Sequence, residues 1–263
     1  MLAGLKSYKI MGIRMKTTVT LIALMMLASL SFQGCATPEV KKSADQLYSE
    51  GEQFFKDKKY QDAIAQWKKV KETYQSPELS TQAELGIANA YFMNEDFIEA
   101  AAGYEDFRKL HPKHLQSDFA LYRQGLSYFK QVHSIDTDQT PVKNAQMVLT
   151  SYLTLYPNGE HLAEVQEKNR DCRDKQLQYE IYVGRFYLKT DAYKAAIARF
   201  ETSLKMFPET ARRDEVLYYL SKTYLEDGQK AKAQELLGQL TREFPGSVHS
   251  ADANKLLSSL NKP

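Results

Sequence analysis

The sequence predicts an all-α solenoid of five helix-turn-helix repeats, with an elongated third repeat and a C-terminal capping helix. One pattern recurs: a small residue, an aromatic residue three later, Ala nine further on, a large residue after four more, and Pro eight beyond that in four copies. The small residues stand at positions 51, 88, 125, 184 and 221, so the spacing is 37, 37, 59 and 37. No segment has strand-like alternation. A fixed period of this length indicates stacked supersecondary units.

The first element is an export signal over residues 1–34. Lys16 precedes an apolar run, Val19–Phe32, that is too short for a membrane-spanning helix, which needs about 20 residues. Gly34 directly before Cys35 resembles the lipobox of bacterial lipoproteins, so we expect cleavage there and lipidation of Cys35. An ordinary signal peptide beside an unrelated Cys is the alternative. Translation could begin at Met1, Met11 or Met15.

The mature chain is expected to start with a short tether, residues 35–43. Its charge gives no reason to expect nucleic acid as a partner. The whole chain has 35 basic and 33 acidic residues. Four of the basic residues and none of the acidic ones precede Cys35, which leaves 31 and 33, a net charge of −2. We expect N-terminal repeats one to three over 44–158, and a linker helix, repeats four and five and the cap over 159–263.

The repeat pattern has a physical explanation in paired antiparallel helices. The small residue and the Ala allow two backbones to approach closely, and Pro ends the second helix. The unit resembles the tetratricopeptide repeat (TPR), padded by three residues. Ser43 and Gln46 form a candidate capping box at the first helix. Thr140 and Pro141 are read as N-cap and first residue of the displaced second helix of repeat three. Residues 161–179 are expected to continue into the next helix, and residues 253–260 to form the cap.

Catalytic and metal-binding patterns are not evident, so the chain is not expected to be an enzyme. Cys172 is interpreted as a free, buried thiol, because Cys35 carries the lipid. His111 and His114 are three apart but flank Pro112, which places them in a turn rather than on a helix face. Sequence motifs of hydrolases and of phosphate-binding loops do not occur. Apart from the covalent lipid on Cys35, no cofactor or metal is expected.

A concave surface is the expected binding site. In TPR stacks, five positions on the first helix of each repeat face the concavity, and aromatic residues are frequent there in the N-terminal half. Such a surface suits an extended peptide with apolar side chains. The alternative is that some of these residues pack between helices, and we expect half to face solvent. The predicted groove residues are Tyr48, Phe55, Leu85, Asn89, Phe92, Phe119, Tyr122 and Phe129.

Several segments resemble a more specific family, BamD (also called ComL), the TPR lipoprotein of the outer-membrane β-barrel assembly machinery. The likeness is carried by Leu110–His114, Tyr122–Leu126, Asp138–Pro141, Tyr179–Tyr187 and Ala192–Arg199. Gln75 and Ser76 depart from the family pattern at the end of repeat one.

The resemblance implies a periplasmic protein on the inner leaflet of the outer membrane. Its C-terminal repeats would dock the barrel-forming subunit, other assembly lipoproteins would attach, and its N-terminal repeats would receive C-terminal targeting segments of unfolded outer-membrane proteins. Arg199 matches a family arginine on the docking side, and the charged positions Arg185 and Lys222 are assigned to the same surface. The alternative function is a TPR lipoprotein adaptor for peptidoglycan enzymes or Tol–Pal components.

Overall fold

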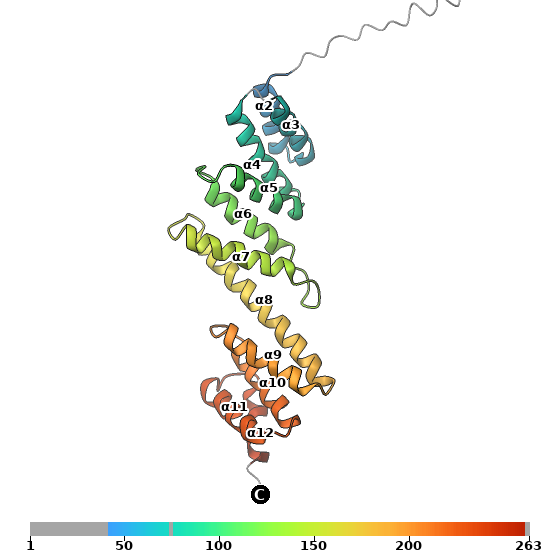
Figure 1. The fold of residues 1–263 in the computed structure, drawn as a ribbon, viewed down its shortest axis with the longest axis vertical. Helices are drawn as coiled ribbons and strands as arrows, with labels where there is room; N and C mark the ends of the chain where they lie inside the picture. The colour runs from blue at the N-terminus through green and yellow to red at the C-terminus, as the bar shows by residue number, and fades with distance from the viewer. Residues whose placement is uncertain (1–41, 74–75, 261–263) are drawn as a thin grey trace, which may run out of the picture. The chain divides into compact units, whose positions relative to one another are not determined.

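Eleven α-helices follow one another in a computed structural model that describes residues 42–73 and 76–260, and no strand occurs in these ranges. The predicted signal, Cys35 and most of the tether lie outside the described residues. The helices (Figure 1) are α2 (Ala44–Lys56), α3 (Tyr60–Thr73), α4 (Pro77–Met93), α5 (Phe97–Leu110), α6 (Ser117–Lys130), α7 (Thr140–Leu155), α8 (Leu162–Lys189), α9 (Tyr193–Met206), α10 (Arg213–Glu226), α11 (Lys230–Glu243) and α12 (Ser250–Leu260).

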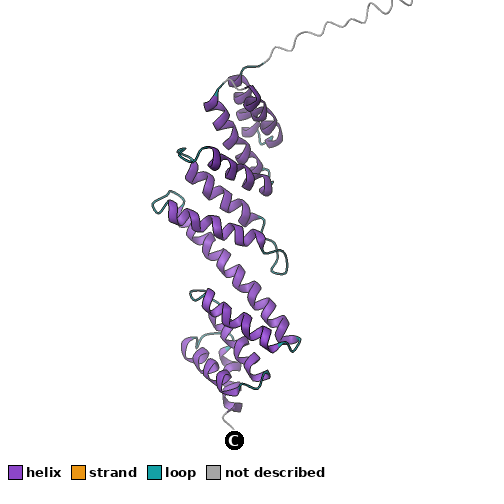
Figure 2. Cartoon of the chain, in the orientation of Figure 1, coloured by secondary structure: helices purple, strands orange, loops and turns teal. Residues whose placement is uncertain are grey.

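Each helix packs mainly on the next one in the chain, and Figure 2 shows the resulting succession of helices joined by turns. Further contacts join α2 to α4, α6 to α8 and α8 to α10, the first helices of neighbouring repeats. This is the arrangement of a TPR solenoid, in which a helix pair buries its apolar face only against its neighbours. The predicted all-helical TPR fold is confirmed, and the order of helices is consistent with five pairs and the cap α12.

Small residues bring the two helices of a repeat close together. A Cβ atom on Gly184 of α8 would lie 2.5 Å from Cε1 of Phe200 on α9. A Cβ atom on Gly125 of α6 would lie 2.6 Å from Cδ2 of Leu149 on α7. Both large side chains are fully buried. The recurring small residue is therefore a position at which the partner helix places a large core side chain.

The long spacing between repeats three and four has two structural causes. The first is the loop at residues 131–139 between α6 and α7, and the second is the length of α8, which has 28 residues. The N-terminal half of α8 buries Val165 and Cys172 in the core of repeat three. Its C-terminal half buries Leu177 and Ile181 with α9. Residues 161–179 therefore do continue into the next helix, as expected.

Helix starts agree with the sequence at one position and differ at another. The Ser43 hydroxyl accepts a hydrogen bond from the Gln46 backbone, and the reciprocal bond is present, so the capping box is confirmed. Thr140 was wrongly expected to be an N-cap, because α7 already begins there. The cap is supplied earlier: the Asp138 carboxylate accepts hydrogen bonds from the Thr140 backbone N–H at 2.9 Å and from its hydroxyl at 2.8 Å.

Ser43–Pro263 forms a single unit by its internal contacts. The predicted tether over residues 35–43 stays a prediction. The division predicted at residues 158–159 falls in the turn between α7 and α8 and stays a prediction.

Candidate peptide-binding groove and docking surface

The eight predicted groove residues lie on α2, α4 and α6, the first helices of repeats one to three. None of them is largely exposed. Six are half-buried, and these are Tyr48, Phe55, Asn89, Phe92, Phe119 and Phe129. Leu85 and Tyr122 are buried. Six of the eight predicted residues therefore keep partial exposure to solvent.

Leu85 is a correction to the predicted groove. Its side chain is 4% exposed and packs with Tyr104 and Phe107 in the core between α4, α5 and α6. Burying a leucine contributes about 1.5–3 kcal/mol, so the fold gains more by covering this residue than by offering it to a ligand. Leu85 belongs to the core of the solenoid.

Tyr122 is a second correction, since it is only 7% exposed. Its ring stacks on His161 with 4.1 Å between the centroids, and its hydroxyl donates a hydrogen bond to Glu164 Oε2 at 2.7 Å. Burial, followed by the nearby Glu164, raises the pKa of this hydroxyl. Tyr122 therefore joins α6 to the start of α8 and is not free to bind a peptide.

An arginine that the sequence did not single out organises the centre of the groove. The Arg123 guanidinium lies 4.1 Å from the ring centroid of Phe92 and 5.5 Å from that of Phe119. Its Nε atom is buried without a hydrogen-bond partner among the described residues. A cation over an aromatic ring is attractive by about 0.5–2 kcal/mol. Phe92, Arg123 and Phe119 thus form one cluster across α4 and α6.

The other groove residues form local clusters of their own. Phe55 packs on Tyr60 and Trp67 within repeat one, at centroid distances of 5.4 and 5.7 Å. Asn89 accepts a hydrogen bond from the Tyr104 hydroxyl at 2.7 Å. Lys168 Nζ lies 5.5 Å from the Phe129 ring centroid.

Tyr48, at the N-terminal end, donates a hydrogen bond to Glu52 at 3.3 Å. From here on, the aromatic groove means Tyr48, Phe55, Asn89, Phe92, Phe119 and Phe129 together with Arg123 and Lys168. Half-buried rings with cations beside them suit a ligand that offers both apolar side chains and a carboxylate.

The three predicted docking residues lie in two places. The Arg185 guanidinium of α8 is 4.8 Å from the Tyr219 ring centroid, and Lys222 Nζ of α10 is 5.6 Å from that of Tyr218. These two residues therefore share the surface where α8 meets α10. Arg199 instead projects from α9 and donates a hydrogen bond to Glu180 Oε2 of α8 at 2.9 Å.

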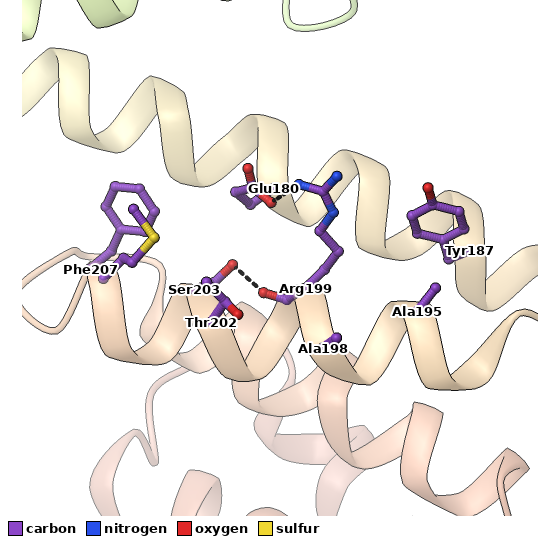
Figure 3. A pocket seen from close by; sticks show the side chains of 9 residues that line it. Glu180, Tyr187, Ala195, Ala198, Arg199, Thr202, Ser203 and Phe207 are labelled. Carbon is purple, nitrogen blue, oxygen red and sulfur yellow. Dashed lines mark hydrogen bonds and ion pairs between the residues drawn. The ribbon is translucent and has the colours of Figure 1, made fainter.

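Arg199 lines a pocket of about 460 Å³ between α8 and α9, which we call the Arg199 pocket (Figure 3). The hydrogen bond and charge of Glu180 raise the pKa of the guanidinium, which stays charged. The remaining walls are mainly apolar and include Tyr187, Ala195 and Met206. Sequence reasoning found Arg199 but not the pocket, because its walls come from two helices. An apolar hollow with one charged pair suits a protein side chain that carries a carboxylate.

Cys172 is free and buried, as expected. Burial raises the pKa of its thiol to about 12. An unfolded thiol titrates near pH 8.5, so protonated Cys172 contributes its full stability below that pH and loses it as the pH rises toward 12. Its thiolate, the reactive form, is therefore scarce at neutral pH.

His111 has a structural partner, since its Nε2 atom lies 2.7 Å from Glu84 Oε2. Over the described ranges, no three metal-ligating side chains come together. In the same part of the chain, no helix is both long and apolar enough to cross a membrane.

A family model matches most of the chain. The sequence model of a family described as outer membrane lipoprotein, YfiO, matches residues 40–238. The chain belongs to this family. The match begins in the tether and ends within α11, so it covers helices α2 to α10 and part of α11. Membership in an outer membrane lipoprotein family indicates association with the outer membrane.

Several curated relatives of this chain are named outer membrane protein assembly factor BamD. The protein from Caulobacter vibrioides is 27% identical, covering 92% of this chain and 81% of the relative. The Rickettsia prowazekii protein is 28% identical over 93% of this chain and 99% of its own length. The Vibrio cholerae protein is 29% identical, covering 74% of this chain and 84% of the relative. The solved TPR2AB domain of yeast Sti1 aligns with a TM-score of 0.42 and 14% identity, covering 83% of this chain and 98% of that one.

Proposed function

We propose that this protein is a non-catalytic scaffold of the outer-membrane β-barrel assembly machinery. The observation that carries the proposal is the family match over residues 40–238, combined with the assembly-factor name shared by relatives that align over most of their length. The structure adds a reason for the scaffold role. Its distinctive surfaces are an aromatic groove and an Arg199 pocket, both of which suit protein side chains.

A lipid on Cys35 holds the scaffold at the periplasmic face of the outer membrane. Only residues 35–43 separate that cysteine from α2, and an extended residue spans at most about 3.6 Å, so the tether reaches roughly 30 Å. Such a short tether keeps the start of α2 within about 30 Å of the lipid-bearing cysteine. Two or more acyl chains give stable anchoring, which a single chain does not.

The barrel-forming subunit docks on the C-terminal repeats, at the Arg199 pocket and at the Arg185 and Lys222 surface. An acidic side chain of that subunit enters the pocket and shares the Arg199 guanidinium with Glu180. Arg199 offers several donors in a planar fork, so it can bind two carboxylates at once. Other assembly lipoproteins attach to the same complex.

Replacing Arg199 by Glu should remove the docking partner. The new carboxylate would face Glu180 and repel the acidic group of the partner, which costs several kcal/mol and lowers recovery by about tenfold or more. A pull-down with tagged protein from detergent-solubilised membranes measures this. The control is Lys194→Glu, which makes the same charge change at an exposed position of α9.

Wild type and Lys194→Glu should both recover a large β-barrel protein with periplasmic repeat domains. Recovery of peptidoglycan enzymes or Tol–Pal components without a barrel protein would show that the proposed function is wrong. Equal recovery by Arg199→Glu would show that docking takes place elsewhere.

The aromatic groove receives the C-terminal targeting segment of unfolded outer-membrane proteins. Phe92 and Phe119 provide a surface for an aromatic side chain, and Arg123 between them provides a cation for the terminal carboxylate. The buried Nε of Arg123 lacks a partner, so its guanidinium is not fully satisfied within the fold. Binding places a complementary charge beside it.

Phe92→Ala should weaken binding of a fluorescent nine-residue strand peptide with a C-terminal Phe. A central aromatic contact contributes about 2 kcal/mol, so the dissociation constant should rise more than about tenfold in fluorescence anisotropy. Met93→Ala is the matched control, because Met93 follows Phe92 on α4 and is 45% exposed. Phe92→Leu keeps apolar volume and should be intermediate. If both alanine variants bind as wild type does, the groove is not the client site.

A further inference from the structure

Helices α4, α6 and α10 are the first helices of repeats two, three and five. They share three positions that the preceding repeat covers. These stacking positions lie five before, one before and two after the small residue. They are Ala83, Ile87 and Ala90 on α4, Ala120, Gln124 and Ser127 on α6, and Val216, Leu220 and Thr223 on α10, and all nine are buried. The helix that covers them is α3, α5 or α9, the second helix of the repeat before. The residues are small or moderate in size because that helix packs directly on them.

On α8 the same three positions are more exposed than on the other first helices within the stack. Tyr179 and Val183 are only half-buried, and Phe186 is 59% exposed. The neighbouring Tyr182 is 47% exposed. We call these four residues the α8 stacking face.

The cause is the length of α8. Side-chain hydrogen bonds between α7 and α8 join Thr150 to Asn169 and Gln146 to Gln176, all before the stacking face. The extra residues of α8 carry Gly184 and its stacking positions past these contacts, and Figure 1 shows α8 continuing beyond α7 to α9.

The composition of this face is unlike that of an ordinary solenoid end. Helix α2 has no helix before it in the described part of the chain, and its stacking positions hold the polar residues Gln46, Glu50 and Gln53. Terminal repeats need a polar outer face to stay soluble. The α8 stacking face has three aromatic residues and a valine instead. Clustered exposed apolar side chains mark an interaction surface, so this face is built to be covered.

Cations line one side of the α8 stacking face. Lys175, Arg185 and Lys189 follow one flank at helical spacing, and none of them has an ion-pair partner in the described part of the chain. The nearby carboxylates are already engaged: Asp171 with Lys168, Asp174 with Arg212 and Glu180 with Arg199. The flank is therefore positive and unneutralised. A second copy docking through the same face would bring these like charges together, which disfavours self-association.

We propose that the α8 stacking face binds an amphipathic helix of another protein. The apolar side of that helix covers Tyr179, Tyr182, Val183 and Phe186, and carboxylates on its edge pair with Lys175, Arg185 and Lys189. The partner helix takes the place that α3, α5 and α9 occupy on the other repeats. This face differs from the Arg199 pocket, because Tyr182 is two residues from Glu180 and points about 200° away around α8.

Accessibility of a thiol at Val183 tests the proposal. Val183→Cys places a thiol within the face and leaves its aromatic and cationic side chains unchanged. Cys172 stays unreactive because it is buried with a raised pKa, and the unsubstituted protein gives the background. Maleimide labelling should be about tenfold slower in native envelopes than in the purified full-length protein, if free partner is present at about ten times its dissociation constant. Gln53→Cys, at an exposed stacking position of α2, should label equally in both preparations.

Charge reversal then tests the chemistry of the partner. In the Val183→Cys background, Lys189→Glu should raise labelling in envelopes at least about fivefold, since like charges at an interface weaken binding. Lys69→Glu, an equal charge change at an exposed position of α3, should leave the rate unchanged.

Three outcomes overturn the proposal. The first is an equal labelling rate in envelopes and in purified protein. The second is protection from labelling that survives Lys189→Glu. The third is protection in the purified protein that increases with protein concentration, together with a dimer in sedimentation. None of them bears on the pull-down through Arg199, so the assembly role stands or fails separately.

Discussion

Gly184→Ala should lower the free energy of unfolding, and Gly238→Ala should raise it. Both glycines lie inside helices, where alanine is intrinsically favoured by about 1 kcal/mol. At Gly184 the new Cβ would meet Cε1 and Cζ of Phe200 at 2.5 and 2.6 Å. That ring is fully buried, so it can move aside only by displacing other core atoms. Overpacking of this kind costs about 1–3 kcal/mol and should outweigh the helix propensity.

At Gly238 of α11 the nearest atom to a new Cβ is Nη1 of Arg242, at 3.0 Å. That atom ends a long, flexible side chain and can move aside at little cost, so the helix propensity should prevail. Urea denaturation followed by circular dichroism measures both variants, with the midpoint and slope compared with wild type. A Gly184→Ala variant as stable as Gly238→Ala would show that α8 and α9 are not as closely packed as the structure has them.

Loss of Cys35 should release the protein from the membrane. A single fourteen-carbon chain gives an association constant with the membrane of about 10⁴ M⁻¹, and stable anchoring takes two lipid signals. Without the lipid, the affinity for the membrane should therefore fall by several orders of magnitude. Cys35→Ala would best be made together with a non-lipoprotein signal sequence, so that export still takes place. Fractionation of the envelope and mass spectrometry of the N-terminal peptide give the readout, and Cys172→Ala in the natural chain is the control.

The wild-type peptide should carry the mass of its lipid, and only the Cys35→Ala protein should appear in the soluble periplasmic fraction. An unmodified Cys35 in the wild-type protein would contradict the lipoprotein assignment. If the Cys35→Ala protein stays with the outer membrane, docking on the C-terminal repeats must hold it there without a lipid.

Much of the fold followed from local patterns. Gly125 and Gly184 indicated where two helices meet, and Pro157 and Pro208 indicated where second helices end. The 59-residue spacing even located the extra residues, which form the loop at 131–139 and lengthen α8. These predictions held because every repeat contacts its immediate neighbours in the chain, so the periodicity of the sequence is also the periodicity of the packing.

The candidate site was less predictable than the fold. Offsets from the small residue placed all eight groove residues on first helices but could not tell which side chains neighbouring helices cover. Leu85 is covered by α5 and α6, and Tyr122 is held by His161 and Glu164, about forty residues later. Arg123 lies two residues before Gly125, outside the groove offsets, yet its guanidinium lies between two of the groove phenylalanines.

The sequence by itself determined the helical repeats, their order and the residues that face one another within a pair. The tertiary structure alone decided which aromatic residues are buried, how Arg199 and Glu180 form a pocket, and that Phe186 lies uncovered on α8. The physical reason is that a side chain's exposure depends on whether another helix lies over it. That is set by helix length and stacking across repeats, whereas propensity, small residues and prolines act over one or two turns of the chain.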